Sequence, residues 1–385
     1  MKKIKTIDWL IVFPYLFLCA TGVLMIYSTS SFELMRQNQF IGGKAIKQLV
    51  FVLIGMATAY FFYRFRFELL FTKNMLRFYM LLSFMLLILV GFTPLGVSVG
   101  GAQRWIPLGG INIQPSEIVN VVFVLYLANY FSHHPISEPA KYRYKKPLAI
   151  CSAYVLLVLI QPNMGGALML IILATVLFLA SGVPVIITAG IGGIAFILRY
   201  LLTHIALMID EQRVPLKFRY LIVRFQLMNN PFLDEYGKGY QTSNSYYAMY
   251  NGGFFGRGYG QSLQKKSYLP AADTDFIFSI IIEELGLIGG IVVLVMPFIM
   301  VLRIIYIGIH CLDSRKALTC FGIACVIFLQ VSVNVGSLLG YIPMTGVTFP
   351  FVSYGGSSLI ILSLLVGIAL NISHSEGERL ELRSI

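Results

Sequence analysis

The stretch Asn251–Gly286 reads NGGFFGRGYGQSLQKKSYLPAADTDFIFSIIIEELG, and it decides the fold class of the chain. Loop-forming residues lead directly into an apolar segment that opens with Asp275 and contains Glu283 and Glu284. An ionised carboxylate in or against a hydrocarbon layer costs several kcal/mol, so it is normally retained for a partner or for a reaction. An acidic residue at the mouth of a membrane helix, beneath a basic glycine-rich loop, therefore points to chemistry on a charged lipid headgroup.

The composition excludes a soluble globular protein. Hydrophobic residues make up 57% of the chain and charged residues 12%, whereas soluble domains carry about 25% charged residues. The net charge of +12 comes mostly from short loops beside apolar runs, where Lys and Arg set orientation and contact anionic lipid. We therefore expect no nucleic-acid partner. The five cysteines lack metal-site spacing, so we predict no metal ligands and no cofactor.

Apolar runs of spanning length recur along the whole chain, which predicts a single all-α polytopic membrane domain over residues 1–385 with about ten transmembrane helices. The runs lie near residues 7–27, 47–63, 78–93, 117–131, 148–161, 166–181, 184–206, 275–303, 317–339 and 355–372. A Pro/Gly interruption at 161–166 suggests broken helices, which are tolerated where the freed backbone faces protein or a water-filled cavity.

Basic residues set the orientation. They are concentrated in the loops 64–77, 132–147 and 303–316 and at the N-terminus, which alternate with less basic loops. Positively charged loops remain on the cytoplasmic side, so we expect both termini on the cytoplasmic side of a cell membrane. The long segment 207–274, between spans seven and eight, is then extracytoplasmic. Within it, Leu216–Met228 has the basic, aromatic character of a helix lying in the membrane interface.

Asp275 is the candidate general base. Partial desolvation raises the pKa of such a carboxyl and nearby cations lower it, which leaves it able to take a hydroxyl proton. The alternative is an N-cap of the following helix, although Thr274 could cap equally well. Asp273 is a second acid nearby, and the sequence does not settle which of the two faces inward. Glu283 and Glu284 lie deeper along the helix, and we interpret them as packing partners rather than catalysts.

The long loop is rich in cations that suit a diphosphate, since Arg forks and Lys point charges stabilise a phosphate leaving group. Attraction to anionic phospholipid is the alternative for each one. The cations are Arg213, Lys217, Arg219, Arg224, Lys238, Arg257, Lys265 and Lys266. The glycines at 252–260 could let backbone amides approach a phosphate, but their order does not match a P-loop, and alone they are typical of a flexible loop.

Two further groups lie outside this stretch. Arg104 beside Trp105 is typical of an interface anchor, and the run Gln114–Glu117 opens a predicted span. The small residues around Ser357 permit close helix packing and could leave hydroxyls along a cavity.

The motifs together resemble the FtsW/RodA/SpoVE (SEDS) family of peptidoglycan polymerases. The matching blocks are GGAQRWIPLGG, IQPSE, GYQ, NGGFFGRGYGQSLQKKSYLP, TDFIF, EELG and a final block that runs from Asn334 through Pro343 and Gly346 to SYGGSS, in that order over essentially the whole chain. The resemblance implies a ten-span fold and a glycosyltransferase that polymerises lipid II, an undecaprenyl-diphosphate-linked disaccharide pentapeptide, outside the membrane. It also implies a class B penicillin-binding protein as partner, and it identifies Asp275 of the TDF motif as catalytic.

The resemblance and the loop charges together define the residues that we expect to bind substrate. They are Arg104, Gln114, Glu117, Arg219, Arg224, Gln241, Lys265 and Ser357. Lys265, four residues before Leu269-Pro270, favours the cell-division (FtsW) branch, which implies septal wall synthesis beside other divisome membrane proteins. An elongation (RodA-like) polymerase remains open, as do a lipid II flippase and a non-enzymatic scaffold. The clustering of reactive residues at the outer face favours an enzyme.

Two positions depart from the family pattern. Asn120 stands where the family usually has Lys, and Asn163 where it usually has Asp. Loss of both charges preserves local charge balance, as expected if an amide pair replaces a buried ion pair. We therefore predict that Asn120 and Asn163 lie close together, and we assign no catalytic role to Asn120.

Overall fold

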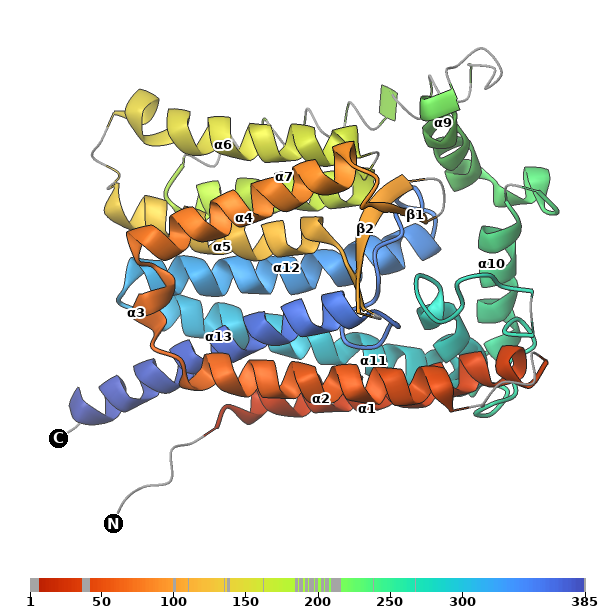
Figure 1. The fold of residues 1–385 in the computed structure, drawn as a ribbon. Helices are drawn as coiled ribbons and strands as arrows, with labels where there is room; N and C mark the ends of the chain where they lie inside the picture. The colour runs from red at the N-terminus through yellow and green to blue at the C-terminus, as the bar shows by residue number, and fades with distance from the viewer. Residues whose placement is uncertain are drawn as a thin grey trace.

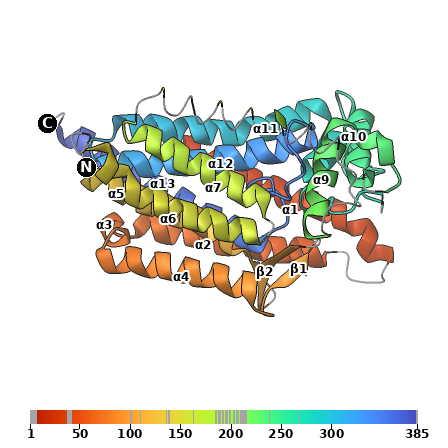
Figure 2. The ribbon, with the colours of Figure 1, turned by 90° about the horizontal axis from the view of Figure 1, so that it is seen from above.

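The computed structural model describes most of the chain. The described residues are 7–36, 42–99, 102–109, 111–134, 136, 139–161, 163–183, 216–237, 239–266 and 268–383, with single residues between 186 and 208. Long helices run side by side in a bundle whose two ends differ (Figure 1). Both chain termini lie at one end, here called the termini end. A small sheet and the helices α9 and α10 lie at the other, here called the sheet end (Figure 1, Figure 2).

The bundle helices are long and contain few charges between their ends. They are α1 (Trp9–Arg36), α2 (Gly43–Arg64), α4 (Lys73–Phe92), α5 (Pro115–His133), α6 (Ala140–Ile160), α7 (Met164–Ala180), α11 (Ile277–His310), α12 (Ser314–Leu338) and α13 (Gly356–Arg383). Each covers one of the predicted apolar runs, which confirms the polytopic all-α fold. The predicted run 184–206 lies mostly outside the described residues.

Six helices in the described part of the chain are long and apolar enough to cross a membrane without further argument. The other bundle helices are shorter or carry more polar residues. The helix α7, for example, has only 17 residues. The interruption at 161–166 separates α6 from α7 as expected. Asn163 caps α7 there by accepting a hydrogen bond from Gly166 N at 3.0 Å.

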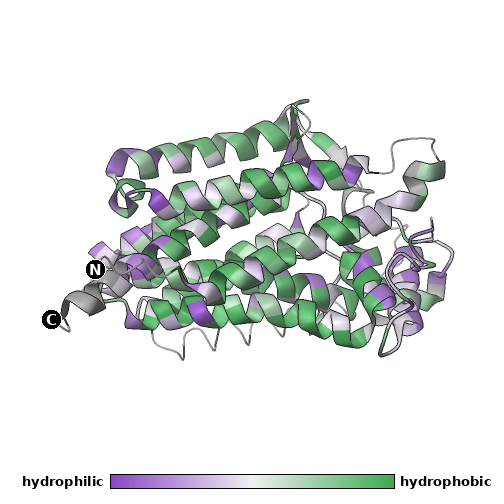
Figure 3. Cartoon of the chain, turned by 90° about the horizontal axis from the view of Figure 1, so that it is seen from below, coloured by the Kyte–Doolittle hydropathy of each residue, from purple (hydrophilic) through white to green (hydrophobic). Residues whose placement is uncertain are grey.

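The centre and the periphery of the bundle differ in burial. In an apolar stretch of 18 residues, 78% of the residues of α12 are buried, whereas only 22% of those of α4 are buried. The helix α12 packs against α11, α5 and α7, whereas large apolar side chains of α2 and α4, such as Phe61 and Leu81, are exposed. Apolar residues line the lengths of the helices and polar residues gather toward the bundle ends (Figure 3). The exposed apolar flanks therefore face lipid.

The sheet end contains structure that we did not predict. Three short strands between residues 97 and 113 form an antiparallel sheet in the order β1-β2-β3. Its strands are β1 (Val97–Val99), β2 (Ala102–Leu108) and β3 (Ile111–Ile113). The sequence of seven-residue β2, AQRWIPL, does not alternate apolar and polar residues as a half-buried strand usually does, and it lies between longer apolar runs.

The long segment before α11 is partly helical. The amphipathic segment forms α9 (Leu216–Asn229), as predicted. Asn230 ends it and caps the short 3₁₀ helix η2 (Pro231–Asp234). The helix α10 (Tyr240–Gly252) follows and packs against α11. This segment thereby brings basic residues of α9 to the same end of the bundle as Asp275.

Candidate functional site

Asp275 lies in the turn that precedes α11, and it does not cap that helix. The N-cap position is Phe276, and no side chain makes a capping hydrogen bond there. The turn closes through Thr274 N and Phe276 N, which both donate to Ala271 O. Ala271 itself has a left-handed φ of 57°, which is uncommon for a residue with a Cβ. The capping explanation for Asp275 therefore does not hold in this structure.

Neighbouring elements hold the backbone of this turn. Asn334 Nδ2 of α12 donates to Asp275 O at 2.9 Å and to Val347 O at 2.8 Å. Ser353 Oγ, just before α13, donates to Thr274 O at 2.7 Å. Segments far apart in sequence thus fix the turn, and the carboxylate does not have to provide that support.

The carboxylate of Asp275 lies against Gly346. A Cβ added to Gly346 would meet Asp275 Oδ2 at 3.5 Å, and the φ of Gly346 is +75°. Glycine is needed because this left-handed backbone conformation disfavours residues with a Cβ. A backbone without a side chain beside the carboxylate leaves room for a substrate group to approach.

Burial and three charged groups determine the ionisation of Asp275. Burial raises its pKa to about 6, Arg224 lowers it, Asp273 raises it, and Arg104 lowers it. Arg104 comes from β2 and Arg224 from α9, so two separate segments bring cations toward one carboxyl group. Asp273 is engaged in an ion pair, since Lys44 Nζ binds its Oδ2 at 3.0 Å, whereas Asp275 is the acid that lies against Gly346.

A small polar cavity of about 30 Å³ borders Gly346 and extends this site into the bundle. It is lined by Gln114, Ser116, Glu117, Asn120, Asn163, Gly166, Met169, Gln330, Gly346, Val347 and Thr348. Glu117 is buried and accepts a hydrogen bond from Ser357 Oγ at 2.9 Å. The predicted substrate residues Gln114, Glu117 and Ser357 are therefore grouped at this cavity, whose wall includes Gly346 next to Asp275.

The predicted proximity of Asn120 and Asn163 is confirmed, since both line this cavity. Asn163 Nδ2 donates to Ser116 Oγ at 3.1 Å, and Ser116 is one turn before Asn120 on α5. Asn120 Oδ1 is buried without a hydrogen-bond partner.

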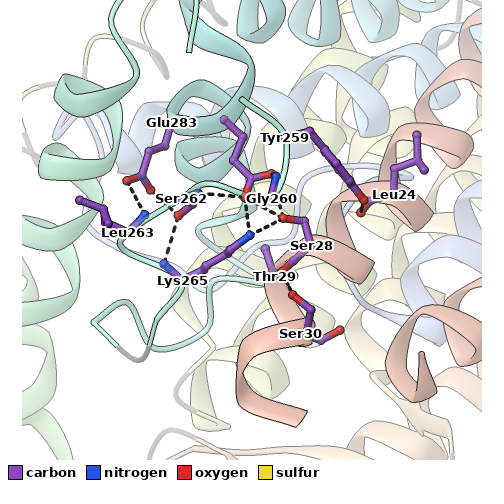
Figure 4. Close-up of polar contacts among 12 residues, drawn as sticks. Leu24, Ser28, Thr29, Ser30, Tyr259, Gly260, Ser262, Leu263, Lys265 and Glu283 are labelled. Atoms are coloured by element: carbon purple, nitrogen blue, oxygen red, sulfur yellow. Dashed lines mark hydrogen bonds and ion pairs between the residues drawn. The ribbon is translucent and has the colours of Figure 1, made fainter. Parts of the chain in front are cut away.

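The prediction that Lys265 binds the substrate diphosphate is corrected by the structure. Its ammonium group donates to Ser28 Oγ and to Glu284 Oε1, both at 2.8 Å. The side chain of Lys265 is 3% exposed and that of Glu284 is 0% exposed. Figure 4 shows Lys265 directed toward Ser28 of α1. Lys265 thus joins the loop to α1 and α11, and its charge is already balanced.

The amides of the glycine-rich loop bind glutamate side chains of α11, so they are not presented to a ligand. Gly260 N donates to Glu284 Oε2 at 3.0 Å, and Leu263 N donates to Glu283 Oε1 at 2.9 Å. Ser262 Oγ donates to Glu283 (Figure 4). The two glutamates are structural, as expected, but their partners are loop amides, serine hydroxyls and Lys265, which an i, i+3 or i, i+4 helix pattern does not reveal.

Two of the predicted substrate-binding residues are not placed among the residues around Asp275 and the small cavity. Gln241 is exposed at the start of α10, and the side chain of Arg219 lies outside the described part of the structure. The sequence did not predict which residues surround the turn at Asp275, namely Asn334, Gly346, Ser353 and Lys44. Asn334 and Gly346 lie in a matching family block, but only the fold brings them to Asp275. Within the described residues, no group of three or more His, Cys, Asp or Glu side chains is arranged to hold a metal ion.

Comparison with known proteins agrees with this architecture. Residues 8–378 match the family model described as "Cell cycle protein", FtsW/RodA/SpoVE. The chain belongs to the FtsW/RodA/SpoVE family. It is 40% identical to a "Probable peptidoglycan glycosyltransferase FtsW" of Enterococcus hirae, with coverage of 100% of this chain and 98% of that protein. It is 33% identical to "Stage V sporulation protein E" of Bacillus subtilis, with coverage of 95% and 96%.

Solved structures of the family share the fold. A chain from "Structural coordination of polymerization and crosslinking by a peptidoglycan synthase complex" superposes with a TM-score of 0.74 at 25% identity, covering 96% of this chain and 98% of that one. The rod shape determining protein RodA of Thermus thermophilus superposes with a TM-score of 0.65 at 25% identity, covering 96% and 97%. This chain therefore has the same fold as these solved members of the family.

Proposed function

We propose that this chain is a peptidoglycan glycosyltransferase that polymerises lipid II into glycan strands, with Asp275 as the general base. The observation that carries the proposal is the environment of Asp275: a carboxyl group with a pKa of about 6, lowered by Arg224 and Arg104 and raised by burial. Such a group is largely ionised at neutral pH yet basic enough to accept a proton in a transition state. The peptidoglycan glycosyltransferase names of its relatives support the same reaction.

The chemistry assigns a role to each charged group. Asp275 takes the proton from the 4-hydroxyl of the acceptor sugar, and that oxygen forms a bond to the anomeric carbon of the donor. The bond from that carbon to the diphosphate oxygen breaks, and undecaprenyl diphosphate leaves with the electron pair. In this proposal, Arg104 and Arg224 stabilise the negative charge that develops on the diphosphate.

The proposal includes an orientation. With the basic loops in the cytoplasm, the termini end faces inward and the sheet end, with Asp275, faces outward. Lipid II then reaches Asp275 with its headgroup in the extracytoplasmic space and its polyprenyl chain in the bilayer.

We further propose a role in septal synthesis, beside a class B penicillin-binding protein and other divisome membrane proteins. The support comes from the relatives named FtsW and from the solved relative described as part of a peptidoglycan synthase complex. The partner's transpeptidase would crosslink the strands that this chain produces.

Purified chain supplied with lipid II, with and without its cognate class B penicillin-binding protein, tests the function. The proposal predicts glycan strands by gel analysis, which accumulate uncrosslinked when the transpeptidase is blocked with a β-lactam. A flippase would move labelled lipid II across vesicle membranes without forming strands. Absence of strands in every arm, with a known polymerase active in the same assay, would contradict the proposal.

A further inference from the structure

A second and much larger cavity lies at the termini end of the bundle, on the side opposite to Asp275. Its volume is about 560 Å³, within the range of about 300–1,000 Å³ typical of ligand sites. It is enclosed by the adjoining ends of α4, α5, α6 and α12, with α3 (Phe67–Leu70) beside them. It shares no lining residue with the site around Asp275.

Regular helix faces form the walls. Lys73, Arg77 and Met80 lie on one face of α4, at spacings of four and three residues, and Tyr126 and Asn129 lie on one face of α5. The charged residues are at the rim, near the ends of the helices. Met80 is seven residues after Lys73 on α4, and Tyr126 is seven residues before His133 on α5, so each lies about 10 Å deeper in the bundle than that residue. The cavity therefore has a basic mouth and an apolar interior.

Among the described residues, no carboxylate pairs with three of the cations at the mouth. Lys73, Arg77 and Lys146 line the cavity, and within the described residues none of them has a carboxylate at ion-pair distance. Arg315, also at the mouth, differs because it binds Glu68 at 3.2 Å. Three uncompensated cations around one opening attract an anion.

The interior contains two polar atoms that have no hydrogen-bond partner among the described residues. Tyr126 is 9% exposed, and its hydroxyl is buried without a hydrogen bond; Asn129 Oδ1 is likewise buried and unsatisfied. Buried polar groups are normally hydrogen-bonded. The hydroxyl can donate a hydrogen bond, so this wall is complementary to a ligand acceptor located below the rim.

We propose that this cavity binds one anionic diacyl phospholipid. The phosphate lies among Lys73, Arg77 and Lys146, an ester carbonyl accepts from Tyr126, and an acyl chain follows the apolar wall beside Met80. A soluble phosphate compound would satisfy the same cations, but it would leave the apolar wall and the Tyr126 hydroxyl without contacts. Basic pockets between membrane helices recognise lipid headgroups in this way.

The full-length protein in detergent, titrated with lipid and observed by native mass spectrometry, tests the proposal without any substitution. We expect one phosphatidylglycerol to bind saturably, in preference to phosphatidylcholine, and soluble glycerol phosphate to compete weakly. Equal binding of the two lipids would overturn the requirement for an anionic headgroup. Glycerol phosphate that binds as tightly as phosphatidylglycerol would overturn the lipid in favour of a free phosphate compound.

Substitutions then locate the site. The double variant Lys73→Gln/Arg77→Gln should weaken phosphatidylglycerol binding about 30-fold, if each cation near the membrane surface contributes as usual. Tyr126→Phe, which removes only the hydroxyl, should weaken it about five-fold. Lys145→Gln is the matched control, because Lys145 is exposed on α6 and does not line the cavity. Equal weakening in the control, or none in either cavity variant, would refute this location.

Discussion

Asp275 is held where its charged form is unfavourable, and this has a consequence for stability. Its pKa in the folded protein is raised from 3.8 to about 6, mainly because burial disfavours the charge. A carboxyl with a raised folded-state pKa destabilises the folded protein once pH exceeds the unfolded pKa, and the penalty is complete above the folded pKa. The ionised carboxylate therefore lowers the free energy of unfolding, while its raised pKa makes it a stronger base.

The first prediction concerns Asp275→Asn. Removing the ionisable group should raise the melting temperature in detergent at pH 8. The gain should diminish as pH falls from about 6 to about 4, where the wild-type carboxyl becomes protonated in both states. Thermal unfolding across this range measures it. Asp273→Asn is the control, since loss of its ion pair with Lys44 should give no gain. A uniform loss of stability in Asp275→Asn at every pH would contradict the assignment.

At the scale of elements, the loop after α10 and the helix α11 depend on one another through two glutamates. Glu284 binds the amide of Gly260 and the ammonium of Lys265. The close packing needs glycine, because a Cβ on Gly256 would clash with the backbone oxygen of Glu284. A buried ion pair contributes little net stability, but loss of one partner leaves an uncompensated buried charge.

The second prediction follows from that ion pair. Glu284→Gln should lower the free energy of unfolding by about 3–5 kcal/mol, because Lys265 stays buried without its counter-charge. Adding Lys265→Met should recover part of the loss. The substitution Lys266→Met, at the exposed neighbouring lysine, should change stability by less than about 0.5 kcal/mol. Denaturant unfolding measures each variant, and a Glu284→Gln protein as stable as Lys266→Met would contradict the role of the pair.

The third prediction concerns the contact between α5 and the start of α7. Asn120→Lys alone should destabilise the protein, since it places a cation in a cavity of about 30 Å³. Asn163→Asp retains the cap on Gly166 N and supplies a counter-charge. The double variant should therefore be more stable than the sum of the single variants, with a coupling of about 0.5–3 kcal/mol. Strict additivity in unfolding experiments would refute the coupling.

The elements differ in how well they could be predicted from the sequence. The bundle helices were predictable because apolar runs of spanning length are a local signal. The sheet at 97–113 was not, since its strands are short and lie between stronger apolar runs. Lys265 was misassigned because its partners, Ser28 and Glu284, are far away in sequence, and a loop lysine carries no local sign of burial. Asp275, Arg104 and Arg224 were predictable as residues, but their convergence is a product of the tertiary fold.

At the scale of the whole molecule, the two ends of the bundle have different chemistry. The sheet end holds the carboxyl group with its two arginines, and the termini end holds the large basic cavity. Positively charged loops remain on the cytoplasmic side of a membrane, so the basic termini end should be cytoplasmic. The reactive carboxyl would then act outside, where the glycan strand is built.

The fourth prediction tests this orientation. In a variant whose native cysteines are replaced, Lys266→Cys should react with a membrane-impermeant maleimide in intact cells, because Lys266 is exposed near the sheet end. Lys145→Cys, exposed at the termini end, should react only after permeabilisation. The reverse pattern would invert the topology and place Asp275 in the cytoplasm.

The central claim is that Asp275 accepts the proton in glycosyl transfer, and one comparison tests it most directly. The rate of glycan formation from lipid II should be measured for the wild type, Asp275→Asn and Asp273→Asn at equal amounts of folded protein. Loss of a general base lowers a rate by about two to four orders of magnitude, and we predict that loss for Asp275→Asn and a far milder effect for Asp273→Asn. Polymerisation by Asp275→Asn at a rate near that of the wild type would show that Asp275 is not the base.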